Sequence, residues 1–127
     1  MAPDSRPLSP HLTVYRWQIT LTMSILHRIT GTGLYLAFAI FVWWLAAAAW
    51  SPGALELFNT LLGHWIGKIV QFGLVWALFH HMLGGIRHFI WDTGNGFSER
   101  ARFGLAWFNL FGGLALTFLA FFFMMAA

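Results

Sequence analysis

Histidines gather in one stretch of the sequence, HHMLGGIRH, which runs from His80 to His88. His81 and His88 are seven residues apart, so on a helix they share a face and lie ~10 Å apart along the axis. Gly84 and Gly85 lie between them, which leaves an imidazole flanked by little side-chain bulk. Such a histidine can be an axial ligand of a haem iron, because a flat macrocycle needs room beside the helix.

The same stretch has a second interpretation, and the spacing leaves both open. Glycines in membrane helices allow close helix packing, and a histidine can form a hydrogen bond to a neighbouring helix. One iron cannot take both His81 and His88, because the offset along the helix is too large. A second axial ligand would therefore come from elsewhere, and another subunit is a candidate. His80 points about 100° away from His81 and is assigned no role.

A second polar group, formed by Ser24, His27 and Arg28, precedes a long apolar run. Its three- and four-residue steps define one helix face, which Gly31 and Tyr35 continue. A hydroxyl, an imidazole and a guanidinium suit a ligand with carbonyl oxygens and an apolar tail, such as a quinone, or the carboxylates of a buried cofactor. In the alternative interpretation, these side chains are polar only because they lie among lipid headgroups, with the arginine as an interface anchor.

The composition indicates what must position these residues. Only 9% of the 127 residues are charged and 59% are hydrophobic, whereas a soluble domain carries roughly 25% charged residues. The chain is therefore expected to be an integral membrane protein. It contains no Cys, which excludes disulfides and thiolate-bound metals. Its net charge of +3 comes from scattered basic residues rather than a stripe, so no nucleic-acid partner is expected.

The hydropathy pattern predicts an all-α membrane protein with three transmembrane helices. Each apolar run reaches the ~20 residues that a helix needs to cross the hydrocarbon core. The predicted organisation is an N-terminal cytoplasmic segment, 1–23, and a three-helix anchor, 24–127, with spans at approximately 26–50, 64–89 and 103–125. The sequence SPG at 51–53 is a helix breaker after the first span.

Basic residues predict the orientation in the membrane, because they accumulate in cytoplasmic segments. Six of the seven lie before or at the start of the first span, or between the end of the second span and the start of the third: Arg6, Arg16, Arg28, Arg87, Arg100 and Arg102. The seventh, Lys68, lies near the start of the second span. The N-terminus is therefore expected inside and the C-terminus outside.

Three segments taken together carry a resemblance to a known family. RPLSPHLTVYRWQ, SILHRITG and HHMLGGIRHFIWDTG resemble the cytochrome b large-anchor subunit of succinate dehydrogenase, respiratory complex II. The resemblance covers essentially the whole chain in length, three-span layout and motif order. The compact length resembles bacterial members, which implies a place in the bacterial inner membrane.

The resemblance implies site residues and partners. His81 would be an axial ligand of haem b, with the other histidine from a smaller sister anchor, and His27 would lie near a haem propionate. Ser24 and Arg28 would line the ubiquinone site. Independently of the resemblance, His88 is expected at the membrane boundary beside Arg87, where haem propionates or loop carboxylates would be natural partners. The implied partners are a flavoprotein subunit that oxidises succinate, an iron–sulphur subunit that passes electrons to ubiquinone, and the sister anchor.

Other functions remain to be weighed. A fumarate reductase runs the same chemistry in reverse, so the anchor sequence does not separate it from succinate dehydrogenase. Other quinone-linked oxidoreductases, such as a formate dehydrogenase or a hydrogenase, have anchors that complete their own haem sites. They need paired histidines on different helices, and only the second span is expected to carry histidines at depth. A non-redox assembly or transport subunit would bind no cofactor at all.

Overall fold

The computed structural model describes residues 14–126, which form helices and no strand. The helices are α1 (Ile19–Trp50), α2 (Pro52–Gly63), α3 (Trp65–Asp92) and α4 (Glu99–Ala126). The predicted N-terminal segment, 1–23, lies outside the described residues up to residue 13. The all-α prediction is confirmed for the described part of the chain.

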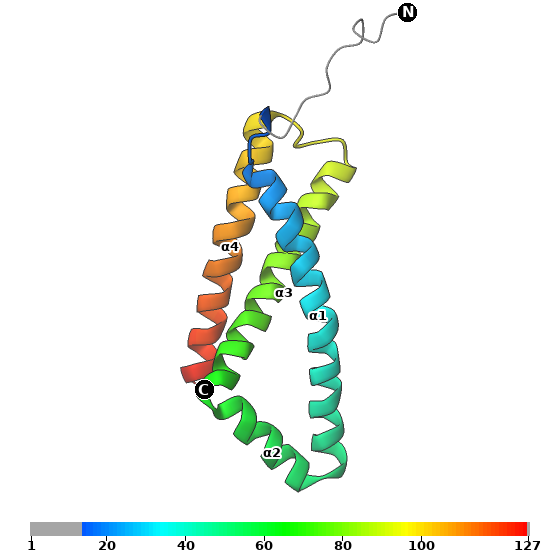
Figure 1. The fold of residues 1–127 in the computed structure, drawn as a ribbon, viewed down its shortest axis with the longest axis vertical. Helices are drawn as coiled ribbons and strands as arrows, with labels where there is room; N and C mark the ends of the chain where they lie inside the picture. Colours follow the sequence, from blue (N-terminus) through cyan, green and yellow to red (C-terminus); the bar gives the residue numbers. More distant parts are fainter. Residues whose placement is uncertain (1–13, 127) are drawn as a thin grey trace, which may run out of the picture.

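Three of the helices run alongside one another, as Figure 1 shows for α1, α3 and α4. Each is long and apolar enough to cross a membrane, which agrees with the three predicted spans. Helix α3 packs against both α1 and α4 and is the centre of the bundle. The helices extend beyond the predicted spans by a few residues, most of all at the start of α1.

The ends of the helices are arranged as the predicted topology requires. The start of α1 and the α3–α4 connection lie at one end of the bundle, whereas α2 and the end of α4 lie at the other (Figure 1). The positive-inside rule places the first of these ends in the cytoplasm. That absolute orientation stays a prediction.

Helix α2 was not predicted, because the breaker at 51–53 was interpreted only as the end of the first span. The chain in fact leaves helical geometry for one residue, Ser51, whose backbone is extended. The Ser51 hydroxyl accepts a hydrogen bond from the Ala54 amide at 3.2 Å, and Pro52 occupies the first turn, where its missing N–H costs nothing. The residues that end α1 therefore also start α2.

Helix α2 contacts both of its neighbours in the chain. Phe58, in the middle of α2, is buried, and its ring meets that of Trp43 of α1 edge-on, with the centroids 5.0 Å apart. Near the end of α2, the Gln71 amide of α3 donates to the Leu62 carbonyl at 3.1 Å. The α2–α3 corner is thereby held close to the bundle.

The connection between α3 and α4 turns the chain through two glycines. Gly94 and Gly96 have φ values of 78° and 79°, a region in which side chains other than glycine are strained. The Ser98 hydroxyl then accepts a hydrogen bond from the Ala101 amide at 3.3 Å and caps the start of α4. Helix α4 thus returns antiparallel to α3.

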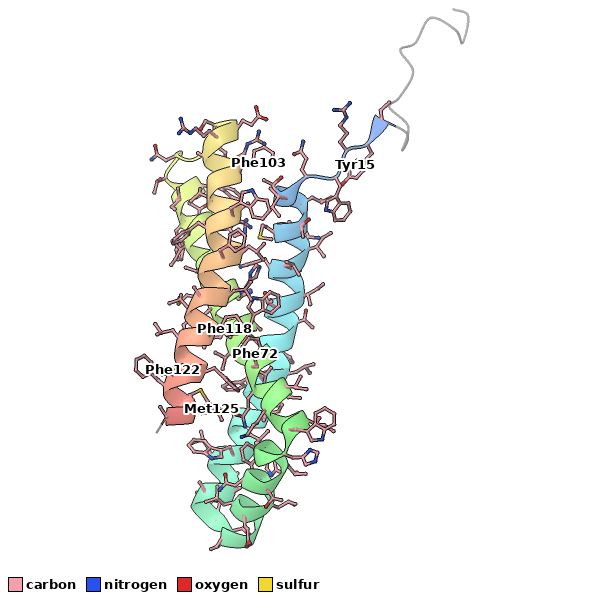
Figure 2. All side chains as sticks on the ribbon, turned by 90° about the vertical axis from the view of Figure 1, so that its left-hand side faces the viewer. Tyr15, Phe72, Phe103, Phe118, Phe122 and Met125 are labelled. Atoms are coloured by element: carbon pink, nitrogen blue, oxygen red, sulfur yellow. The ribbon has the colours of Figure 1, made fainter. Side chains whose placement is uncertain are left out.

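The interior of the bundle changes character along its length. Towards the α2 end, Phe72 of α3 packs against Phe118 and Phe121 of α4, with ring centroids 5.3 and 5.4 Å apart, and Figure 2 shows Phe72 beside Phe118. The buried polar side chains are Thr30, His80, Arg87, Asn109 and Thr117, and all of these except Thr117, which precedes Phe118, lie nearer the other end of the bundle. In a membrane bundle such groups are costly and mark candidate functional positions.

Candidate functional site

His81 is half-buried on the side of α3 that packs against α1. Its Nδ1 is 3.1 Å from the main-chain oxygen of His27 and 3.4 Å from the Thr30 hydroxyl. A carbonyl oxygen only accepts, so the Nδ1 of His81 carries the proton. The Nε2 of a neutral His81 then keeps its lone pair, which is the state that a metal-ligating imidazole needs.

The His27 side chain lies directly on the His81 ring. The two rings are stacked, with centroids 4.0 Å apart and planes inclined by 12°. The His88 ring is near the same place, 5.2 Å from that of His27. The structure therefore brings together the three histidines predicted as cofactor-binding residues, although they come from two helices.

His27 lies at the level of His81, so the expectation that only the second span carries histidines at depth was wrong. His27 is about eight residues into α1, and His81 is about eleven residues before the end of α3, or roughly 12–17 Å from the same end of the bundle. The two rings still cannot hold one iron between them. Two imidazoles that bind one iron from opposite sides must point their ligating nitrogens at each other, whereas the stacked rings of His27 and His81 face each other with their flat sides.

Two glycines allow this close approach of α1 and α3. A Cβ on Gly31 would come within 2.9 Å of Cε1 of His81, and a Cβ on Gly84 would overlap Cδ2 of His27. Of the two interpretations left open for this stretch, the structure favours close helix packing at Gly84, because the His27 ring fills the space beside it. A Cβ on Gly85 would meet nothing within 4 Å, so Gly85 is the glycine that leaves open space beside His81.

The stripe predicted on α1 is divided in the structure. His27 and Gly31 face α3, whereas Arg28 is exposed and Tyr35 keeps 77% of its surface exposed. Ser24 is half-buried, one turn before Arg28. Arg28 is therefore accessible to a ligand that approaches from outside the chain. Tyr35 lies about eleven residues, or ~16 Å, further along the helix than Ser24, which is too far to share one headgroup with it.

His80 and Asn109 form a buried pair that sequence reasoning missed. His80 is fully buried, and the side-chain Nδ2 of Asn109 on α4 lies 3.2 Å from its Nδ1 and 3.1 Å from its main-chain oxygen. An amide nitrogen only donates, so Nδ1 of His80 accepts and its proton is on Nε2. The available signal was a lone Asn within an apolar, uncharged span.

Arg87 is also buried, with 3% of its surface exposed. Its guanidinium lies 5.1 Å from the centre of the Trp91 ring, a favourable cation–π geometry. The Nε and Nη1 atoms have no hydrogen-bond partner within the described residues. The charge pattern indicated only the contribution of Arg87 to membrane topology, because a charge pattern carries no information on burial.

The described residues contain no group of three or more His, Cys, Asp or Glu side chains that could hold a bare metal ion. A haem does not need such a group, because its macrocycle supplies four ligands and the protein only the axial ones. His81 fits this demand through its free Nε2 lone pair, and the open space at Gly85 adjoins it.

Comparisons with known proteins show the family to which the chain belongs. Residues 2–121 match the family described as "Succinate dehydrogenase/Fumarate reductase transmembrane subunit". The chain is 45% identical over 92 residues to the succinate dehydrogenase cytochrome b556 subunit of Paracoccus denitrificans, covering 72% of this chain and 71% of that one. The Rickettsia felis subunit of the same name is 40% identical over 116 residues, or 91% and 90%.

A mitochondrial relative is similar over a shorter share of its own length. The human succinate dehydrogenase cytochrome b560 subunit is 41% identical over 98 residues, which are 73% of this chain and 56% of the human protein. The family match and the three long apolar helices together make the chain a multi-pass membrane protein.

Proposed function

The chain belongs to the succinate dehydrogenase/fumarate reductase transmembrane-subunit family, and from this we propose that it is the cytochrome b membrane-anchor subunit of a bacterial succinate dehydrogenase. It anchors a flavoprotein subunit and an iron–sulphur subunit to the inner membrane and pairs with a second, smaller anchor. Electrons from succinate pass through the iron–sulphur clusters to ubiquinone at the cytoplasmic end of this chain.

Haem b is held by His81 and by a histidine of the sister anchor. The observation that carries this proposal is the hydrogen bond from His81 to the His27 carbonyl, which leaves Nε2 of His81 as the ligating atom. His80 cannot take this role, since its Nε2 carries the proton and the ring is enclosed between α3 and α4. His27 stacks on the His81 ring and His88 lies next to His27, so both would lie near a haem propionate. A haem at this position supplies a one-electron store.

The ubiquinone headgroup is bound by Ser24 and Arg28. Both are accessible near the end of the bundle that the positive-inside rule assigns to the cytoplasm. Reduction of a quinone places negative charge on its oxygens, and a guanidinium and a hydroxyl stabilise that charge by donating hydrogen bonds. The exposed position of Arg28 suits a ligand that enters from the membrane and is shared with the partner subunits.

The haem assignment is tested by a pair of variants in the purified, assembled complex. His81→Ala is expected to abolish or change the b-type spectrum in reduced-minus-oxidised difference spectra. His88→Ala should perturb it less, because its ring lies about two turns further along α3. Subunit stoichiometry and succinate oxidation by an artificial acceptor confirm assembly. An intact low-spin spectrum in His81→Ala together with its loss in His88→Ala would reverse the assignment.

The quinone site is tested by Arg28→Ala, with Arg16→Ala as the matched control because Arg16 is exposed and precedes α1. A lost hydrogen bond to a charged group costs roughly 1.5–3 kcal/mol, so quinone reduction should fall by about ten- to a hundredfold. Arg28→Lys should restore only part of the rate, since a point charge lacks the planar fork of donors. Normal quinone kinetics in assembled Arg28→Ala complex would make Arg28 an interface anchor.

A further inference from the structure

Side chains of α1 and α4 meet beside Gly84 of α3, and within the described residues one buried polar atom of each has no hydrogen-bond partner. Asn109 of α4 is 1% exposed and directs its Nδ2 to His80. Its Oδ1 therefore remains, and within the described residues this atom accepts no hydrogen bond. The buried Nε2 of His27 on α1 likewise has no partner there.

These two atoms are close and chemically complementary. A Cβ built on Gly84 would lie 3.0 Å from Nε2 of His27 and 3.3 Å from Oδ1 of Asn109, so both atoms border the same small volume. The Nε2 of a neutral imidazole can donate a hydrogen bond, and an amide oxygen accepts one. In a membrane bundle bulk water is absent, so such a pair is expected to be satisfied within the protein.

The orientation of the Asn109 amide is fixed independently of His27. Its nitrogen has two acceptors on His80, the ring Nδ1 and the main-chain oxygen. A flipped amide would turn its oxygen towards that carbonyl, which cannot donate. The oxygen must therefore face away from His80, on the side where Gly84 and His27 lie.

We propose that one water molecule bridges Nε2 of His27 and Oδ1 of Asn109, which form no direct hydrogen bond, and that Asn109 thereby acts as a positioning residue for His81. The connection runs from His80 through Asn109 and His27 to His81, and it crosses α3, α4 and α1. His27 positions His81 in two ways. Its ring stacks on the His81 ring, and its main-chain carbonyl accepts a hydrogen bond from Nδ1 of His81.

This arrangement makes the orientation of the His81 ring depend on α4, although His81 bonds only to α1. The role of His81 as a haem ligand rests on the proposed function. The link between His27 and Asn109 does not, since it is inferred from two buried polar atoms that both border Gly84 and have no other partner within the described residues. The experiment tests the link between His27 and Asn109 separately from haem binding by His81.

The experiment uses the assembled complex with Asn109→Leu, which keeps a similar volume and removes both polar atoms. The matched control is Thr117→Val on the same helix, because Thr117 is fully buried and its hydroxyl donates only to Gly113 of α4, at 2.7 Å. Nitrogen-15 NMR of labelled histidines reads the hydrogen bond at His27. Electron paramagnetic resonance of the oxidised haem reads the relative orientation of the axial imidazole rings through its g values.

Asn109→Leu is expected to retain haem, to lose the hydrogen-bonded Nε2–H signal of His27 and to shift the g values, whereas Thr117→Val matches the wild type in both. Should Asn109→Leu fail to assemble, Asn109→Asp keeps an acceptor towards His27 and gives up the donor to His80. It is expected to retain the His27 signal.

Three results would overturn the inference. The first is a wild-type density map in which the two atoms point apart with no bridging water. The second is unchanged g values in haem-loaded Asn109→Leu, and the third is loss of the His27 signal in Asn109→Asp. A complex that shows the His27 signal but contains no haem would refute the proposed haem function and leave the hydrogen bond standing.

Discussion

Two faces of α3 carry adjacent histidines, His80 and His81, in different tautomers. On the face towards α1, His81 is half-buried, donates through Nδ1 and keeps a free lone pair on Nε2. On the face towards α4, His80 is fully buried, accepts at Nδ1 and carries its proton on Nε2. One residue of rotation, about 100°, separates a candidate ligand from an interior side chain.

The difference shows that the partner of Nδ1, more than residue type or spacing, decides what a membrane histidine can do. A main-chain carbonyl forces the tautomer that leaves Nε2 free to ligate. An amide nitrogen forces the other tautomer and excludes ligation by Nε2. The glycines near the two rings also have different neighbours. A Cβ on Gly31 or Gly84 would meet an imidazole ring, whereas a Cβ on Gly113 of α4 would meet the backbone of His80.

The largest effect is expected from Gly84→Ala, on the α1 side. Its new methyl group would overlap the His27 ring, which already lies between His81 and Gly84. Overpacking a buried site costs about 1–3 kcal/mol, so the melting temperature of the complex, followed by the loss of the haem absorption bands, should fall. The control is Gly73→Ala on the same helix, where a Cβ meets nothing within 4 Å. Equal melting temperatures for the two variants would contradict the packing of His27 against Gly84.

A smaller effect is expected from Gly31→Ala, compared with Gly33→Ala on the same helix. The methyl group at 31 would come within 2.9 Å of Cε1 of His81, whereas at 33 it meets nothing within 4 Å. The imidazole can yield by a small rotation, so the complex should assemble with its haem. The absorption bands and g values should shift, because the ligand ring has turned. A spectrum identical to that of Gly33→Ala would mean that His81 does not lie against α1.

The three spans could be predicted from the sequence because the absence of charge over long runs is a property of the residues themselves. The site residues could be chosen because His27, His81 and Arg28 stand in specific motifs. Their arrangement could not be predicted, because periodicity gives the direction of a side chain on its own helix and not the neighbour it meets. Gly84 shows this limit, since the sequence left cofactor space and helix packing both open there, and only the structure shows that the His27 ring fills the space.

The other failures have local physical causes. Helix α2 was missed because a Ser-Pro-Gly sequence ends one helix and, through Ser51 and Pro52, caps the next. Asn109 was passed over because a single amide scarcely changes the hydropathy of a 28-residue helix. Its meaning depends on His80, which lies 29 residues earlier in the chain. Pairings of this kind are set by tertiary packing and leave no periodic signal.

The smallest effect is expected on the α4 side, from Gly113→Ala compared with Gly104→Ala on the same helix. A Cβ on Gly113 would lie 3.3 Å from Cα of His80, so α3 and α4 need to separate by only a few tenths of an ångström, whereas a Cβ on Gly104 meets nothing within 4 Å. Alanine is also favoured over glycine within a helix by about 0.5–1 kcal/mol, which offsets part of the cost. The melting temperature should therefore change little, and the haem spectrum should not change, because the His81 ring is on the opposite face. Loss or shift of the haem bands in Gly113→Ala, with a normal Gly104→Ala, would place the cofactor on the α4 side and reverse the roles of His80 and His81.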